Sequence, residues 1–165
     1  MNVLKSFVRV MEVFNKYVGY LLAIILAVMT LLIFWQVVSR HFFGTPLSWS
    51  EELARFLMIY LIMVGSALAT KDGGMISVDI LLEKFESTKF KPYIITIAQL
   101  LSIIFFVVLF IYGYQFAMNS FNQIAPGSQI SMGWVYLSIP FGAVLLTINS
   151  ITRIVSVFVG EEKTE

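Results

Sequence analysis

Residues 92–152 read PYIITIAQLLSIIFFVVLFIYGYQFAMNSFNQIAPGSQISMGWVYLSIPFGAVLLTINSIT, and these 61 residues contain no Asp, Glu, Lys, Arg or His. A helix that crosses a bilayer needs roughly 20 apolar residues, so the run is too long for one span. Residues 119–131 divide it, because this segment is polar, uncharged and contains Pro126-Gly127, which is typical of a loop. The run therefore predicts two transmembrane helices, at about 93–118 and 134–153.

Two further spans precede this run. Residues 17–39 are uncharged, and they predict an uncleaved helix, because the run is too long for a signal peptide and no small-x-small cleavage site follows it. Residues 56–70 are also uncharged but form a helix only about 22 Å long, whereas a bilayer core is roughly 30 Å thick. We therefore expect the second span to cover about 50–70 and to include Glu51, Glu52 and Arg55.

The composition points to the same class of protein. The 165 residues are 59% hydrophobic and 13% charged, with a mean hydropathy of +0.88, whereas soluble domains carry about 25% charged residues. We predict an all-α membrane protein in which residues 1–165 form a single integral membrane domain with four transmembrane helices. The net charge of +1 indicates no nucleic-acid partner, and the lack of Cys excludes disulfides and thiolate metal sites.

The distribution of Lys and Arg predicts that both termini are cytoplasmic. Nine of these residues lie before the first span, between the second and third spans, or after the fourth, and two lie on the other side. Short loops rich in Lys and Arg stay in the cytoplasm. The same topology places all three Trp residues, Trp35, Trp49 and Trp134, at the outer boundary of the membrane, where aromatic belts are expected.

Two segments outside the spans are amphipathic. The first, residues 1–16, either lies on the inner leaflet or forms the first turns of a long first helix. The second, residues 76–90, follows the hinge-like Lys71-Asp-Gly-Gly74 and either lies on the membrane or packs against a partner.

The densest polar cluster is Pro46-Leu-Ser-Trp-Ser-Glu-Glu-Leu-Ala-Arg55. One interpretation is a capped, ion-paired helix start, because Ser48 and Glu51 have capping-box spacing and Glu51 and Arg55 stand at i and i+4. The other interpretation is an interface element, because one Arg for two Glu leaves a carboxylate without a donor near the hydrocarbon edge. Arg40 or a partner subunit would supply that donor.

The predicted spans lack the groups that transport and catalysis need. No charged residue lies in the middle of a span, whereas secondary transporters usually carry ionisable groups at depth. Asn149 and Gln99 are isolated polar residues that we interpret as helix–helix hydrogen bonds, and the one histidine, His41, lies at a membrane boundary. We predict no catalytic residue, no metal site, no cofactor and no enzymatic activity. A self-contained four-helix multidrug exporter is the alternative, but it would need a membrane-embedded carboxylate.

Several motifs together resemble one family. The string Trp49-Ser-Glu-Glu-Leu-Ala-Arg55 is followed by Gly65-Ser-Ala-Leu-Ala69, Ile76-Ser-Val-Asp-Ile-Leu81 and Met132-Gly-Trp-Val-Tyr136. In this order and spacing they resemble the small membrane subunit of tripartite ATP-independent periplasmic (TRAP) transporters over roughly residues 15–155. Many members have His before the Ile-x-Val-Asp string, whereas this chain has Met75, which puts in doubt any role that needs an imidazole there.

The resemblance implies a non-catalytic scaffold subunit of a sodium-coupled uptake system in a bacterial inner membrane. Its implied partners are a large multi-span membrane subunit that carries the substrate and sodium sites, a periplasmic substrate-binding protein that delivers an organic acid such as a dicarboxylate or a sialic acid, and the membrane lipids. Such a subunit would anchor the static part of the large one and help to dock the binding protein. For the partner interface we expect Arg40, Trp49, Ser50, Glu51, Glu52, Arg55, Asp79 and Trp134.

Overall fold

In the described part of the chain, four helices are long and apolar enough to cross a membrane. The computed structural model describes residues 2–44, 47–71 and 91–159. Within these residues the helices are α1 (Asn2–Phe43), α2 (Ser48–Lys71), α4 (Lys91–Asn119), α5 (Met132–Tyr136) and α6 (Ser138–Val159). The candidate spans are Ser6–Phe42, Ser48–Thr70, Tyr93–Asn119 and Met132–Val157. The predicted all-α fold with four transmembrane helices is confirmed.

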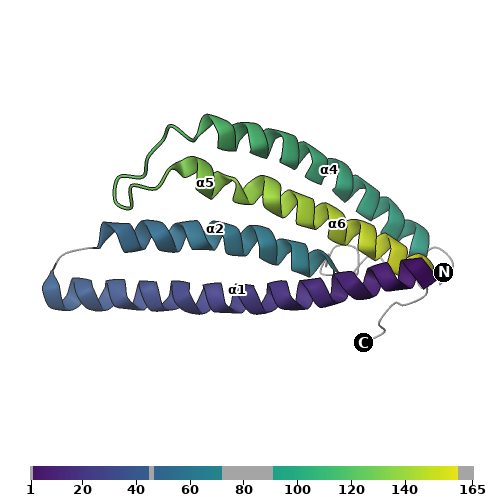
Figure 1. Ribbon diagram of the computed structural model, residues 1–165, viewed down its shortest axis with the longest axis horizontal. Coiled ribbons are helices and arrows are strands. Elements are labelled where there is room, and N and C mark those ends of the chain that lie inside the picture. The colour runs from purple at the N-terminus through teal and green to yellow at the C-terminus, as the bar shows by residue number, and fades with distance from the viewer. Residues whose placement is uncertain (1, 45–46, 72–90, 160–165) are drawn as a thin grey trace.

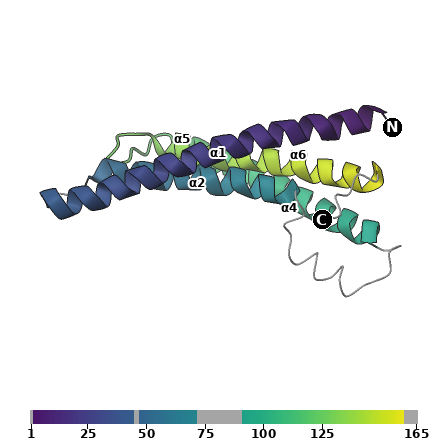
Figure 2. The same ribbon diagram turned by 90° about the horizontal axis from the view of Figure 1, so that it is seen from below.

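The four long helices lie side by side in the order α4, α6, α2, α1 (Figure 1). In the most apolar 18-residue stretch of each span, 56% is buried in the span that contains α6, against 6% in the span of α1. Helix α6 is therefore the central element, and α1 and α4 expose most of their surface. Seen from below, the N-terminal half of α1 diverges from α2 (Figure 2).

Helix α1 is continuous over 42 residues. Of the two interpretations of residues 1–16, the structure supports the first turns of a long first helix. At about 1.5 Å per residue this helix is about 63 Å long, roughly twice the thickness of a hydrocarbon core. Its N-terminal part therefore extends beyond a perpendicular span. The second amphipathic segment, 76–90, lies outside the described residues.

The fourth span is interrupted between α5 and α6 at Leu137. Pro140 explains the break, because proline has no backbone N–H and its ring clashes with the carbonyl four residues earlier. The Ser138 hydroxyl donates to the carbonyl oxygen of Val135 at 2.7 Å, and Phe141 N donates to Leu137 O at 3.2 Å. These bonds satisfy backbone groups at the interruption, so the break is accommodated within the bundle.

The core lies where α1, α2, α4 and α6 meet. Its buried residues are Val64, Ala67, Phe106, Leu145 and Leu146, and Val18 and Leu22 of α1 pack against them. Two glycines permit this close packing. A Cβ at Gly142 would lie 2.8 Å from Cβ of Met63, and a Cβ at Gly113 would lie 2.6 Å from Cγ2 of Ile139. Small residues at helix contacts let backbones approach closely in a membrane.

Candidate functional site: the polar cluster at the start of α2

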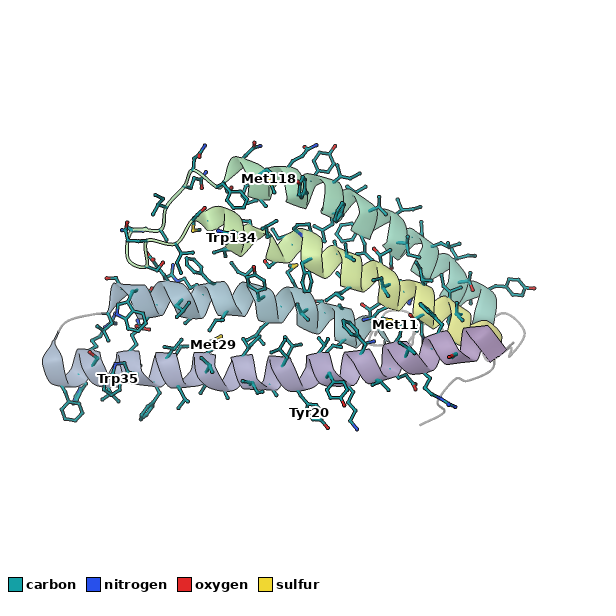
Figure 3. The ribbon with its side chains drawn as sticks, in the orientation of Figure 1. Met11, Tyr20, Met29, Trp35, Met118 and Trp134 are labelled. Carbon is teal, nitrogen blue, oxygen red and sulfur yellow. The ribbon has the colours of Figure 1, made fainter. Side chains whose placement is uncertain are left out.

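Of the cluster 46–55 predicted from the sequence, residues 47–55 lie at the end of the bundle where α1 ends, α2 begins and the connection from α4 to α5 turns (Figure 1). Trp35 and Trp134 lie toward this end, and Tyr20 points away from α2 near the middle of α1 (Figure 3). Trp35, Trp49 and Trp134 are all exposed. Exposed indole rings are typical of a membrane boundary.

Glu51 forms one half of the cluster. Its carboxylate forms an ion pair with Arg55 one turn later and accepts a long hydrogen bond, 3.4 Å, from Nε2 of Gln36 on α1. The predicted i, i+4 pair is thus present. The predicted capping box is not formed. Ser48 is the first residue of the helix rather than the residue that caps it, and the Glu51 carboxylate bonds to Arg55 and Gln36.

Glu52 forms the other half, and its carboxylate binds the loop between α4 and α5. One oxygen accepts the backbone N–H of Gly127 at 2.9 Å. The other accepts the backbone N–H of Ser128 at 2.7 Å and the Ser128 hydroxyl at 2.9 Å. A carboxylate with three donors in this geometry is well satisfied. The donors expected from the sequence were Arg40 or a partner subunit; the structure supplies loop amides instead.

The loop that Glu52 binds has a defined shape of its own. Ala125 N donates to Ile130 O at 2.9 Å, and Met132 N donates to Gln123 O at 2.8 Å. Gln129 adopts a positive φ of 57° at the turn. Gly127 makes a tight contact, because a Cβ there would lie 3.0 Å from the backbone of Ser48 and 3.1 Å from the Glu52 carboxylate. Residues 120–131 are therefore a structured cap on the start of α2.

The other predicted interface residues are distributed around this cap. Ser50 is fully buried and donates its hydroxyl to Leu47 O at 2.8 Å. Trp134 packs edge-on against Phe121, and its carbonyl accepts the Tyr60 hydroxyl at 2.7 Å. Arg40 is exposed on the last turns of α1, and Asp79 lies outside the described residues. The partner interface at these positions stays a prediction.

A second polar cluster lies nearer the N-terminal end of the bundle. Asn149 of α6 and Asn15 of α1 are buried and exchange amide hydrogen bonds of 2.8 and 3.3 Å. Nδ2 of Asn149 also donates to Ala67 O of α2 at 2.6 Å. The predicted helix–helix role of Asn149 is confirmed. Its partner Asn15 is missed by sequence reasoning, because Asn15 falls in the polar pattern of the amphipathic segment 1–16.

The chemistry available at the cluster is that of structural contacts. Within the described ranges, no group of three or more His, Asp or Glu side chains is placed to hold a metal ion. The two carboxylates of the cluster are engaged by Arg55, Gln36 and the loop amides. What the arrangement does is join α1, α2 and the 120–131 loop at one membrane boundary.

Comparison with known proteins places the sequence of this chain in a family. The family model described as "Tripartite ATP-independent periplasmic transporters, DctQ component" matches residues 29–160. The chain belongs to the DctQ family. The sequence-based resemblance to the small membrane subunit of TRAP transporters is confirmed, and the exporter alternative is not favoured. The family and the four apolar helices together support a multi-pass protein of a bacterial inner membrane.

Individual relatives are TRAP permease proteins. The DctQ-family chain is 34% identical to the sialic acid TRAP transporter small permease protein SiaQ of Vibrio cholerae, over 81% of the chain and 75% of that relative. It is 32% identical to a putative TRAP transporter small permease protein of Haemophilus influenzae, over 90% and 94% of the two chains. It is also 32% identical to the sialic acid TRAP transporter permease protein SiaT of Haemophilus influenzae, where the match covers 67% of this chain but only 18% of SiaT.

Proposed function

We propose that this chain is a non-catalytic scaffold subunit that binds the large permease of a sodium-coupled TRAP transporter for organic acid uptake. The observation that carries the proposal is the match to SiaT, in which the region similar to this chain is 18% of a much longer permease. In that relative the small-subunit region and the rest of the permease share one polypeptide. A chain that holds only the small region would bind its large counterpart as a separate subunit.

The helix arrangement suits a static partner. Asn15, Ala67 and Asn149 join three helices through buried amides, and Glu52 joins α2 to the 120–131 loop. Such bonds at both ends of the bundle hold the helices in one register. A scaffold needs rigidity and an apolar surface, and it does not need ionisable groups at depth.

We propose the N-in, C-in orientation on the charge distribution, nine Lys and Arg against two. The start of α1 and the end of α6 lie at the same end of the bundle (Figure 1), as this topology requires. The 120–131 loop then faces the periplasm. It is uncharged and exposes Ile124, which makes it the surface by which the chain would help to dock the periplasmic binding protein.

Reconstitution of uptake tests the scaffold role. The large permease of the same bacterium is placed in proteoliposomes with or without this chain, with the binding protein and radiolabelled organic acids, beginning with a sialic acid. We expect uptake only when both membrane proteins are present and sodium flows inward. Full uptake by the permease alone would overturn the scaffold role, and uptake unchanged at equal sodium on both sides would overturn sodium coupling.

A further inference from the structure

One exposed stripe of α2 carries Arg55 toward one end and small residues toward the other. The residues of this stripe recur at intervals of three or four and are all exposed. They are Arg55, Met58, Ile62, Ser66 and Ala69. We name this stripe the Arg55 face. Val64 and Ala67, which belong to the core, lie on the other side of the helix at 100° per residue. The Arg55 face is therefore directed away from the chain's own core.

The charged residue of the Arg55 face lies inside the boundary of the hydrocarbon core. Arg55 and Lys71 are 16 residues apart, or about 24 Å along the helix. If Lys71 marks one boundary of a core about 30 Å thick, the backbone of Arg55 lies about 6 Å inside the other. The Arg55 side chain is 68% exposed and that of its partner Glu51 is 41% exposed. An ionised side chain at this depth either reaches back to the membrane boundary or faces protein or water.

The rest of the face is shaped for a close neighbour. Toward the end of α2, Met58 and Ile62 are followed by the small residues Ser66 and Ala69. Gly65 lies at the edge of the face, and a Cβ placed on it would meet no atom within 4 Å. The Ser66 hydroxyl already donates to Ile62 O at 2.6 Å, so it needs no hydrogen-bond acceptor on a neighbouring helix. By contrast, the exposed face of α4 carries large apolar side chains, among them Leu101, Ile104 and Phe105.

We infer that the Arg55 face is the surface on which a transmembrane helix of the large permease packs. The expected partner helix carries small side chains along its contact stripe and a hydrogen-bond acceptor, a carboxylate or a free carbonyl, opposite Arg55. This inference rests on the proposed function. The match within SiaT places the region in one polypeptide with a large permease, and so argues for that occupant. A second copy of this chain is disfavoured, because a two-fold contact on this face would bring two Arg55 guanidinium groups together.

Site-specific photo-crosslinking tests the inference in native membranes. A photoreactive phenylalanine analogue replaces Met58 or Ile62 on the Arg55 face, or Leu101 or Ile104 on α4 as matched exposed controls. We expect light to shift Met58 and Ile62 variants to the summed mass of this chain and the permease, while the α4 variants stay unshifted. A shift from α4 without one from α2 would overturn the inference, as would a shift to twice the mass of this chain.

A second variant separates this inference from the proposed function. Gly65→Leu fills space that is empty in the isolated chain, so its unfolding temperature should not fall, but about tenfold less permease should co-purify. Ile104→Trp on α4 is the control and should change neither quantity. If the permease co-purifies with the natural chain but Gly65→Leu has no effect, only the docking face is wrong. If no permease co-purifies with the natural chain, the proposed function itself fails.

Discussion

The backbone amide of Ser128 lies 2.7 Å from the carboxylate of Glu52, its acceptor, across 76 positions of sequence. Together with the amide of Gly127 at 2.9 Å, it fixes the α4–α5 loop on the first turns of α2. The donors are neutral and the acceptor is charged, which makes these bonds stronger than bonds between neutral groups. The start of α2 and the loop therefore behave as one unit.

Glu52→Gln should release this loop. A glutamine side chain keeps one acceptor oxygen but turns an NH2 group toward backbone donors, so either Gly127 or Ser128 loses its partner. We expect the amides of Gly127 and Ser128 to exchange with solvent deuterium about an order of magnitude faster. Hydrogen-exchange mass spectrometry of the purified chain measures this.

Glu51→Gln is the matched control for that experiment. Glu51 bonds to Arg55 and Gln36, so its loss should leave exchange in residues 125–131 unchanged. Equal acceleration by both variants would mean that the general charge at the helix start, and not the Glu52 contact, holds the loop.

The buried amides at the other end of the bundle should be coupled. Asn149→Leu removes bonds to Asn15 and Ala67 O, and it should lower the free energy of unfolding by about 1–2 kcal/mol in mild detergent. Asn15→Leu should cost less, because Asn149 keeps Ala67 O. The double variant should cost less than the sum of the two single variants. Additive losses would show that the two amides do not interact.

Two glycines, Gly142 on the side of α6 that faces α2 and Gly65 on the exposed side of α2, should respond differently to a methyl group. Gly142→Ala places a Cβ 2.8 Å from Cβ of Met63 and should destabilise the isolated chain by about 1–3 kcal/mol through overpacking. Gly65→Ala meets no atom within 4 Å and should not destabilise it. Thermal unfolding of both variants, followed by light scattering, compares them. Equal losses would contradict the packing of α6 on α2.

The proposed orientation can be tested by labelling, because the chain has no cysteine of its own. Asn122 and Ser6 are both exposed, and each is replaced by Cys in turn. A membrane-impermeant maleimide added to spheroplasts should label N122C and spare S6C until the membrane is opened. The reverse pattern would invert the topology.

The helices could be predicted from the sequence because the patterns that indicate them are local. Uncharged runs such as 17–39 identify spans by length alone, and the Glu51–Arg55 pair follows from i, i+4 spacing. The interruption at Leu137 lies just before Pro140, because proline disturbs the turn that precedes it.

The tertiary contacts were beyond sequence reasoning for a physical reason. The partners of Glu52 are backbone N–H groups of Gly127 and Ser128, which every non-proline residue possesses, so no residue type marks them. Asn15 and Asn149 are 134 positions apart, and neither has a pattern that names the other. The charge count at 46–55 correctly indicated a missing donor but could not show that it lies within the chain.

The most direct test of the account is a mild-detergent purification of the tagged full-length chain from its native membranes, with the co-purifying proteins identified and their stoichiometry measured. The account predicts one large multi-span TRAP permease per copy of this chain. Recovery of the chain alone, or only with further copies of itself, would contradict the scaffold role.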